Sequence, residues 1–591
     1  MREKRWRLAK ADGDYIGIGK HLGVDPLLVK LMMNRGLTDA AKMKRYLQTD
    51  GFAPADPFLF QDMERLVTTL LEKRAAGRKI RILGDYDIDG VCASYILHQG
   101  LRRLGFSADV EIPDRILDGY GINEELVKLA AAEGVDTMLT CDNGIAAGKA
   151  IRLGNRLGLT MLVTDHHQIP ADENGEQILP AASAVINPHR KDCRYPFKPI
   201  CGAMVAWHVI RALYLSLRET EPKLREAADL PQLWPDLLMF AALATVGDVM
   251  KLNGENRSVV QAGLQLMRTV PQLGLDSLLQ VQGIEKNSLN VYHLGFVIGP
   301  CLNAGGRLDT AKRSLAMLES TVPSKALAAA EALAGLNEER KDMTGKFTDI
   351  GLRQAEQSTA DVLVIYLPDC HESIAGIVAG RIREYTYKPT YVVTKSGEGL
   401  KGSGRSVPGY SMFDALCRCD RFLQKYGGHP MAAGFSLPEK ELEGFRAALE
   451  ADASGLDYDR IETVTVDSLL PIPYITEELI GQLERLEPFG NGNPKPVFGI
   501  KRAVCSQARL VGAAGYLRCQ VEDGYGGRCQ AICFMEQERL REQICCRYSP
   551  EDYERFISGR LRLQLHLTVY PRLNTFRDMT TVQLQITDVK A

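Results

Sequence analysis

The chain has 591 residues, which is too long for one ordinary hydrophobic core, so about three or four domains are expected. Its 45 % apolar and 25 % charged residues are typical of a globular protein and exclude a disordered or membrane-embedded chain. The formal net charge of −2 excludes a basic surface spread over the whole molecule. Residues 499–591 nevertheless carry 14 Lys and Arg against 10 Asp and Glu.

The apolar runs and the cysteines bear on where the protein is located. No stretch approaches the ~18 consecutive apolar residues of a membrane span, and Met1 is followed by charged residues rather than by a secretion signal. The 14 cysteines follow no repeating spacing, so they are better interpreted as reduced thiols than as a disulfide framework. A soluble cytoplasmic protein is therefore expected.

From residue 79 to residue 188, short apolar runs alternate with amphipathic stretches. The runs predicted to be strands are 79–84, 108–112, 136–140, 161–164 and 184–186. The helices predicted between them are 91–104, 123–132 and 146–157. This alternation predicts an α/β domain with a parallel sheet, and such sheets bind their ligands beyond the carboxyl ends of the strands.

The second half of the chain changes character twice. Ala, Leu, Glu and Lys dominate residues 310–358, and after Pro323 roughly thirty-five residues are predicted to form one long helix that joins two domains. A second α/β unit begins at Asp361. The alternating segments 561–569 and 581–586 then predict an all-β barrel.

Acidic residues and histidines follow several of the apolar segments of the first unit. These segments end in Asp85-Tyr86-Asp87-Ile88-Asp89-Gly90, in Thr140-Cys141-Asp142-Asn143-Gly144, in Thr164-Asp165-His166-His167 and, after the apolar run 237–246, in Gly247-Asp248. So many carboxylates at one edge of a sheet would repel one another, and divalent cations remove that conflict. Oxygen ligands with a few imidazoles suit Mn²⁺ or Mg²⁺. The sequence therefore predicts a metal site.

Each motif by itself has a simpler interpretation. Residues 85–90 are also typical of a calcium-type loop or an acidic turn, and Asp142-Asn143-Gly144 is an ordinary turn signal. A His-His pair is often a surface pair, and Asp248 is also a candidate helix cap. The conjunction of the motifs at the ends of the segments is what favours the metal site.

In this order, the motifs resemble the DHH phosphoesterases, and among them the single-strand-specific exonucleases. Asp165-His166-His167 matches the signature of the family. The other matches are residues 85–90, Asp118-Gly119-Tyr120-Gly121, Asp142-Asn143-Gly144, residues 187–198, Ala244-Thr245-Val246-Gly247-Asp248, Gly254-Glu255-Asn256-Arg257, Leu302-Asn303-Ala304-Gly305-Gly306-Arg307-Leu308, Gly402-Ser403-Gly404-Arg405-Ser406, Gly427-Gly428-His429, Ala432-Ala433-Gly434 and Leu486-Glu487-Pro488-Phe489-Gly490-Asn491-Gly492-Asn493-Pro494. The ordered set covers most of the chain and is highly specific.

The resemblance implies both an architecture and an activity. The implied domains are an N-terminal region with the DHH domain (1–320), a connecting helix (321–358), a smaller α/β DHH-associated domain (359–455), and a linker with an OB-fold barrel (456–591). The implied activity is 5′→3′ hydrolysis of single-stranded DNA to nucleoside 5′-monophosphates, in DNA repair and recombination. It uses two divalent cations, which activate water and stabilise charge on the phosphate. A helicase or single-strand-binding protein is an implied partner, and a monomer is expected.

The resemblance also assigns roles to residues. The implied metal ligands are Asp87, Asp89, Asp142, His166 and Asp248, with Asp85 and His167 as catalytic support beside them. The implied substrate-binding residues are Arg307, Ser403, Arg405, Ser406, Gly428 and His429, whereas the role of His371 stays open. Glycines permit close approach to a phosphate and Arg binds it bidentately. No Gly-Lys-Ser/Thr of a nucleotide-triphosphate loop is present.

Two positions depart from the family pattern. Cys301 stands where the family commonly has arginine, which removes a cation near the cleft, and Gly247 stands where alanine is usual. In the barrel, Tyr516, Tyr525, Tyr570 and Phe576 are candidates for stacking on bases, although core packing is an equally good interpretation of each.

Three rival functions remain at this point. A phosphodiesterase of the same superfamily that acts on short oligonucleotides or cyclic dinucleotides, or a pyrophosphatase, would have no use for the barrel. A non-catalytic scaffold that binds single strands at replication forks would not need the complete ligand set.

Overall fold

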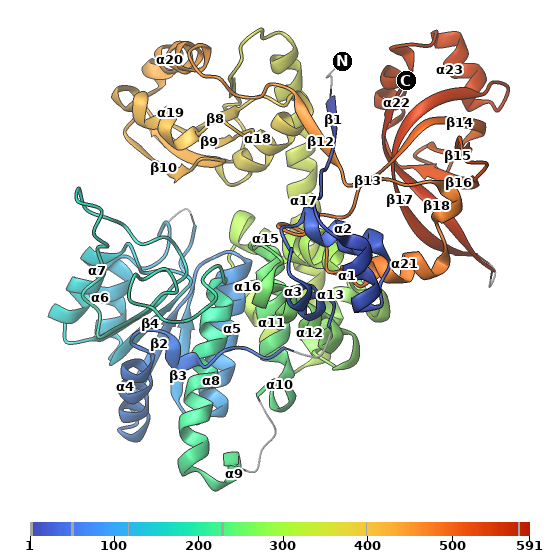
Figure 1. Ribbon diagram of the computed structural model, residues 1–591. Coiled ribbons are helices and arrows are strands. Elements are labelled where there is room, and N and C mark those ends of the chain that lie inside the picture. The colour runs from blue at the N-terminus through green and yellow to red at the C-terminus, as the bar shows by residue number, and fades with distance from the viewer. Residues whose placement is uncertain (1–3, 49–51, 116–117, 226–229, 398, 577–578) are drawn as a thin grey trace.

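The computed structural model describes residues 4–48, 52–115, 118–225, 230–397, 399–576 and 579–591. Three bodies are visible in Figure 1, with the first α/β domain at the lower left, the second above it and the barrel on the right. Helix α17 runs between the two α/β domains. Within the described residues, no helix combines the length and the apolar character needed to cross a bilayer.

The predicted parallel sheet is confirmed. Its strand order is β3-β2-β4-β5-β6, and all four pairings are parallel. The strands are β2 (Lys79–Leu83), β3 (Ser107–Glu111), β4 (Thr137–Cys141), β5 (Thr160–Thr164) and β6 (Ala184–Ile186). The helices between them are α5 (Ile88–Arg103), α6 (Glu124–Ala132) and α7 (Gly148–Arg156), and α4 (Met63–Ala75) precedes the sheet.

Both faces of this sheet are covered by apolar cores, which is why its strands are apolar throughout. Alternate residues of one strand belong to different cores. Leu139 packs with α5 and with α8 (Gly202–Thr220), whereas Met138 packs with α6 and α7 on the other face. Because both faces are buried, the ligand crevice can form only at an edge of the sheet.

The apolar run 237–246 is a helix and not a strand of the sheet. It lies within α11 (Pro235–Gly247), and all residues from Leu237 to Thr245 are buried. A helix that is buried on every side has no polar face, so its sequence shows no 3.6-residue period. The helices that follow it are α12 (Gly254–Thr269), α13 (Leu273–Val281), α14 (Val291–His293), the π-helical segment Leu294–Ile298, α15 (Gly299–Leu308) and α16 (Lys312–Glu319).

The long connecting helix is confirmed as α17 (Pro323–Glu356), which has 34 residues. It leads into the second α/β domain, whose sheet has the order β10-β11-β9-β8-β7, with only β7 and β8 parallel. These strands are β7 (Leu363–Tyr366), β8 (Thr390–Ser396), β9 (Gly399–Arg405), β10 (Lys425–His429) and β11 (Ala432–Leu437). The helices are α18 (Glu372–Thr386), α19 (Met412–Arg418) and α20 (Leu442–Ser454).

The C-terminal barrel is also confirmed, and pairing of its first strand with the penultimate strand closes it. Its strands are β14 (Phe498–Val511), β15 (Tyr516–Glu522), β16 (Arg528–Cys533), β17 (Leu563–Phe576) and β18 (Met579–Lys590), with α22 (Gln537–Cys545) and α23 (Pro550–Ile557) inserted between β16 and β17. Of the candidate stacking rings, Tyr570 is buried and Tyr525 is exposed. The side chain of Phe576 lies outside the described residues.

The N-terminal helices pack on the barrel rather than on the first α/β domain, with which the predicted boundaries had grouped them. Helices α1 (Tyr15–Leu22), α2 (Pro26–Asn34) and α3 (Ala40–Leu47) share one hydrophobic core with the barrel and with α21 (Glu477–Glu484). Strand β1 (Lys4–Leu8) pairs in parallel with β12 (Glu462–Val466), as Figure 1 shows. Residues from the two ends of the chain thus form one unit.

Candidate metal centre

The carboxyl edge of the parallel sheet gathers the acidic residues and histidines that the sequence singled out. Asp85 and Asp87 follow β2, Asp142 follows β4, and His166 with His167 follow β5. Asp248 reaches the same place from the C-terminal end of α11, so it comes from a helix and not from a strand. Asp248 occupies the C-cap position of α11 through its backbone N–H, and is not an N-terminal cap whose side chain accepts a backbone hydrogen bond.

Three overlapping groups of side chains in this cluster have ligand atoms within 4.8 Å of one another. They are Asp142 with His166 and His167, Asp89 with His166 and Asp248, and Asp85 with Asp87 and Asp142. His166 Nε2 is central, because it lies 3.1 Å from Asp142 Oδ1, 3.5 Å from Asp89 Oδ2 and 3.9 Å from Asp248 Oδ2. The cluster therefore contains all five of the residues expected to be metal ligands.

Two buried carboxylate oxygens of the cluster accept no hydrogen bond from the described residues, and this fits a cation. Asp85 Oδ1 and Asp142 Oδ1 are buried and accept no hydrogen bond within the described residues. Burial and the charge of Asp87 raise the pKa of Asp85 to about 8, and burial with the charge of Asp89 raises the pKa of Asp142 well above its usual range. Such desolvated, mutually repelling carboxylates are stabilised by a divalent cation with oxygen and imidazole ligands.

The backbone around the cluster explains why these residues point inward. Asp87 caps α5 by accepting the N–H groups of Asp89 and Gly90, at 2.9 and 3.1 Å. Asp142 has φ of 62°, in the left-handed region that Asp tolerates better than most residues. Gly90 is required because a Cβ there would lie 2.4 Å from the carbonyl oxygen of Asp85. The turn residues Asp87, Gly90 and Asp142, which lie in the motifs named from the sequence, are therefore part of the site.

Asp89 is held by the beginning of α8. Its Oδ2 accepts the N–H of Gly202 at 2.6 Å and its Oδ1 accepts the N–H of Ala203 at 2.7 Å. The positive end of a helix dipole stabilises the ionised carboxylate. Because each carboxylate oxygen has two lone pairs, Asp89 keeps acceptor capacity for a cation.

Three residues beside the cluster were not assigned roles from the sequence. Asp165 Oδ1 accepts a hydrogen bond from His167 Nδ1 at 2.8 Å, and Asp165 Oδ2 accepts the N–H of Ile145. The Tyr120 hydroxyl donates to the backbone oxygen of Asp142 at 3.0 Å, and Asn187 Nδ2 donates to the backbone oxygen of His167. Asp165, Tyr120 and Asn187 lie within the matched motifs. A motif does not show which of its residues would bind the metal and which only hold those ligands in position.

Arg307 of the first α/β domain interacts electrostatically with Asp87 of this cluster and with Arg405 of the second α/β domain. Arg307 on α15 donates from Nη1 to the backbone oxygen of Ser373 on α18 at 2.6 Å, so it joins the two domains. Burial, reinforced by the positive charges of Arg115 and Arg340, lowers the pKa of Arg307 to about 10. Burial also lowers the pKa of Arg405 on β9, beside Ser403. Arg307 and Arg405 are partly buried and have no carboxylate partner among the described residues, so their guanidinium groups are suited to bind an anion.

The remaining substrate-binding candidates divide into two kinds. His429 and Gly428 lie on the exposed strand β10, and Gly428 has φ of 143° with no room for a Cβ beside Ala432 and Ala433. Ser406 is buried instead, and its hydroxyl donates to the backbone oxygen of Tyr410 at 2.6 Å. In this arrangement Ser406 supports its own loop rather than presenting its hydroxyl to the cleft.

The two departures from the family pattern have clear environments. Cys301 is fully buried, and burial raises the pKa of its thiol to about 11, so no charge stands there. A Cβ on Gly247 would lie 2.6 Å from Ile88 Cγ2, at the start of α5. An alanine at position 247 would therefore require Ile88 to shift.

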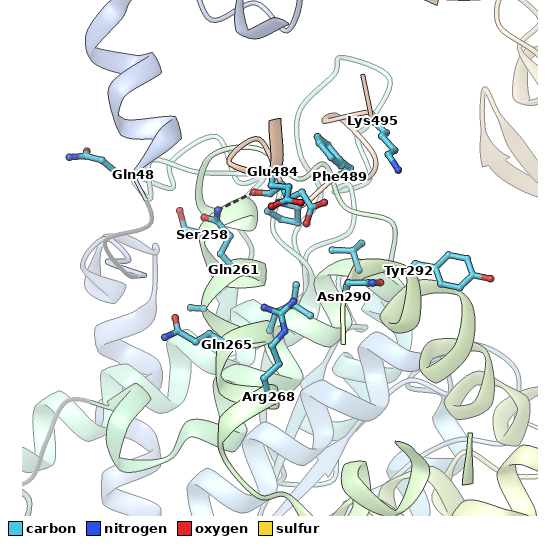
Figure 2. Close-up of a pocket in the computed structure, with 15 residues that line it drawn as sticks. Gln48, Ser258, Gln261, Gln265, Arg268, Asn290, Tyr292, Glu484, Phe489 and Lys495 are labelled. Atoms are coloured by element: carbon cyan, nitrogen blue, oxygen red, sulfur yellow. Dashed lines mark hydrogen bonds between the residues drawn. The ribbon is translucent and has the colours of Figure 1, made fainter. Parts of the chain in front are cut away.

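A cavity of about 620 Å³ lies away from the metal cluster, between α12, α14 and the segment 484–495. Figure 2 shows Gln261, Gln265 and Arg268 of α12 on one side, with Glu484, Phe489 and Lys495 opposite. Gln261 Nε2 donates to the backbone oxygen of Glu487, which ties α12 to the linker before the barrel. The lining includes two cationic side chains and two acidic ones, so the cavity has no strong net charge. These residues are Arg268, Lys495, Glu484 and Glu487.

Comparisons with known proteins identify the family. Three family models match: the DHH family N-terminal domain at residues 79–241, the DHHA1 domain at 359–455 and the RecJ OB domain at 466–588. The single-stranded-DNA-specific exonuclease RecJ of Dickeya dadantii is 35 % identical over 518 residues, which cover 85 % of this chain and 87 % of that protein. The chain belongs to the RecJ family.

Other RecJ proteins give the same result with different coverage. RecJ of Bacillus subtilis is 33 % identical over 516 residues, which are 86 % of this chain but 63 % of that protein, so the chain spans less than two thirds of that relative. The crystal structure of RecJ from Thermus thermophilus in complex with Mn²⁺ matches with a TM-score of 0.81 and 26 % identity over 99 % of this chain and 79 % of that one. The same protein in complex with Mg²⁺ matches with a TM-score of 0.76.

Proposed function

We propose that the chain is a metal-dependent exonuclease that removes nucleotides from the 5′ end of single-stranded DNA and releases nucleoside 5′-monophosphates, in DNA repair and recombination. The observation that carries this proposal is the cluster of carboxylates and imidazoles around His166 Nε2, together with the partly buried Arg307 and Arg405, which have no carboxylate partner among the described residues. A phosphodiester held between cations and arginines is the substrate that such a cleft suits. Relatives named as single-stranded-DNA-specific exonucleases support the choice of DNA.

Two divalent cations, Mn²⁺ or Mg²⁺, are the proposed cofactors. The proposed ligands are Asp87, Asp89, Asp142, His166 and Asp248. When bound, such cations lower the pKa of water and stabilise negative charge on phosphate oxygens. The buried oxygens of Asp85 and Asp142 that accept no hydrogen bond among the described residues support this assignment, because a cation would compensate their charge. The hydrogen bond between His167 and Asp165 holds the imidazole of His167 in place beside the proposed ligands.

The substrate phosphate is assigned to groups of both α/β domains. Arg307, Ser403, Arg405 and His429 would bind its oxygens, while Gly428 and Ser406 shape the loops that carry them. Closure of the second domain over the first positions the terminal phosphodiester at the carboxylate cluster, and the bond from Arg307 to Ser373 supports this arrangement. The barrel would bind the strand beyond the cleft.

The setting of the reaction is part of the proposal. The chain would act as a monomer in the cytoplasm, on single strands supplied by a helicase or kept open by a single-strand-binding protein. Its 14 cysteines are free thiols, which suits a reducing compartment.

Two rival functions are less well supported. A phosphodiesterase for short oligonucleotides or cyclic dinucleotides leaves the barrel without a role. A non-catalytic scaffold leaves unexplained why the ligand set is complete and why buried carboxylate oxygens are unpartnered.

The test is digestion of single-stranded DNA labelled at the 5′ or the 3′ end, with Mn²⁺ or with chelator. Labelled mononucleotide should appear at once from the 5′ label, and Asp248→Ala should abolish it while Asp172→Asn, in an exposed loop, should not. Release from the 3′ label first would contradict the proposed polarity. DNA binding without cleavage under any metal would favour the scaffold.

A further inference from the structure

One family motif has no part in the chemistry proposed above. Residues 488–494, here called the clamp loop, precede the barrel and lie against the turn that follows Asp248. The loop is far from Asp248 in sequence, so the contact is a product of the fold.

The turn after Asp248 contains an unfavourable backbone conformation. Val249 has φ of 56°, although β-branched residues avoid the left-handed region. Met250 N–H donates to the Thr245 oxygen at 3.1 Å, which places Val249 at the helix-terminating position where glycine is usual. Val249 is 66 % exposed, so packing does not hold the residue in this conformation.

The clamp loop forms hydrogen bonds with this turn, which side-chain packing does not hold. Asn491 Nδ2 donates to the Val249 carbonyl oxygen at 2.7 Å, and the Asn491 carbonyl oxygen accepts the N–H of Leu252 at 2.7 Å. These two bonds bracket the turn. The close approach of the clamp loop to this turn requires glycine on both sides of Asn491. A Cβ on Gly490 would lie 2.7 Å from Leu252 Cδ1, and a Cβ on Gly492 would lie 2.9 Å from Lys251 Cβ.

The clamp loop is itself held from the N-terminal helices. Asn493 is buried, and its Nδ2 donates to the backbone oxygens of Leu486 and Pro488, at 2.9 and 2.8 Å. Arg35, at the end of α2, donates from Nε to Asn493 Oδ1 at 2.9 Å and from Nη2 to the Pro494 oxygen at 2.7 Å. A continuous series of bonds thus runs from α2 to the turn beside Asp248.

We propose that the clamp loop sets the position of Asp248 as a metal ligand, with Asn491 as the positioning residue. Asn491 holds Val249 in its left-handed conformation, and this orients the Asp248 carboxylate toward His166 and Asp89. The unit made by the N-terminal helices and the barrel thereby controls the affinity of the metal centre. The inference rests on the metal ligation proposed above and assigns no new chemistry to Asn491.

The experiment measures Mn²⁺ binding to the full chain without DNA, by electron paramagnetic resonance of free Mn²⁺. Asn491→Ala should weaken binding about 10-fold, the size found when residues that orient metal ligands are removed. Asn155→Ala is the matched control, because Asn155 Nδ2 also donates to an exposed backbone oxygen, that of Ala181, away from the cluster. Both variants should unfold at the same temperature as the parent chain in chelator.

Val249→Gly distinguishes positioning from a general loosening. Glycine adopts the left-handed conformation freely, so the turn then needs no clamp. Asn491→Ala should therefore cost much less Mn²⁺ affinity in the Val249→Gly background than in the parent. Unchanged Mn²⁺ affinity of Asn491→Ala, or an equal loss in both backgrounds, would overturn the inference. Mn²⁺ binding with the expected coupling but no digestion of DNA would refute the proposed exonuclease and leave this inference standing.

Discussion

His167 Nδ1 lies 2.8 Å from Asp165 Oδ1, and the same oxygen also accepts the backbone N–H groups of His166 and His167. One carboxylate thus fixes the conformation of the strand end that carries both imidazoles. Burial opposes the charge on each partner, but their bond holds the pKa of Asp165 below its usual range and raises the pKa of His167 to about 9. Asp165 is therefore a charged anchor beneath the metal centre.

Replacement of Asp165 should impair the metal centre, although Asp165 is not one of the proposed metal ligands. Asp165→Asn keeps the shape but removes the charge, so activity on single-stranded DNA should fall about 10- to 100-fold, as for other residues that orient metal ligands. Asp172→Asn, in an exposed loop, is the control. Initial rates at increasing Mn²⁺ would check this, and full activity of Asp165→Asn at low Mn²⁺ would contradict it.

The metal-free protein should lose stability as the pH rises. Asp85 has a pKa of about 8 in the folded chain, above about 3.9 when unfolded. Folding therefore favours the protonated acid, and the contribution present at low pH is lost as the pH rises from about 4 to about 8. In chelator, the melting temperature at pH 8.5 should lie on the order of 5 °C below that at pH 6.

Thermal scans with and without Mn²⁺ test this dependence. Mn²⁺ should raise the melting temperature more at pH 8.5 than at pH 6, because the cation compensates ionised carboxylates. Asp85→Asn should reduce the pH dependence in chelator. The expectation fails if the metal-free chain is as stable at pH 8.5 as at pH 6 and Asp85→Asn changes nothing.

Gly376 on α18 leaves the space that Arg405 and Ser403 occupy. A Cβ on Gly376 would lie 2.8 Å from both Arg405 Nη2 and Ser403 Oγ, whereas one on Gly380, a turn later, would be 3.9 Å from Arg405 Cγ. Gly376→Ala should therefore displace the guanidinium and raise KM for DNA about 10-fold, a loss of about 1.4 kcal/mol.

Gly380→Ala is the matched control for this substitution. Alanine favours a helix by about 1 kcal/mol over glycine, so Gly380→Ala should stabilise the chain and leave KM unchanged. Equal KM values for the two variants would contradict this prediction. Steady-state kinetics on an end-labelled oligonucleotide give both values.

Arg307 should act on substrate binding and on the contact between the domains. Arg307→Ala removes a partly buried cation and the bond to the Ser373 oxygen, so KM should rise at least 10-fold and Mn²⁺ affinity should stay within about twofold. Arg156→Ala, at the far end of α7, is the control. A selective loss of Mn²⁺ affinity would instead place Arg307 with the metal centre.

The local signals in the sequence predicted much of this molecule. Short apolar runs that alternate with amphipathic stretches predicted the parallel sheet, and the Ala-, Leu-, Glu- and Lys-rich composition after Pro323 predicted α17. Acidic residues and histidines that follow the apolar segments predicted the cluster. The origin of Asp248 was missed because α11 is buried on all sides, so its apolar run has no period. The support from Asp165 could not be separated from ligation, because both use the same residue types.

Long-range contacts were beyond the sequence for a different reason. Nothing in the pattern of α1, α2 and α3 shows that their apolar faces pack on the barrel, because amphipathicity gives a face but not its partner. The bond from Asn491 to Val249 joins residues 242 positions apart. A sequence motif indicates that a loop has a role. Only the fold shows that this loop binds the backbone oxygen of Val249.

The shared core of the two chain ends also fixes the order of events during synthesis. Helices α1 to α3 leave the ribosome roughly 420 residues before Leu470 and the barrel strands that cover them, a delay of tens of seconds at about 5–20 residues per second. During that time their apolar faces need another cover, such as a chaperone. Asn491 is also translated after every residue of the metal cluster, so in a nascent chain the turn after Asp248 lacks its two hydrogen bonds to Asn491 until the clamp loop is made.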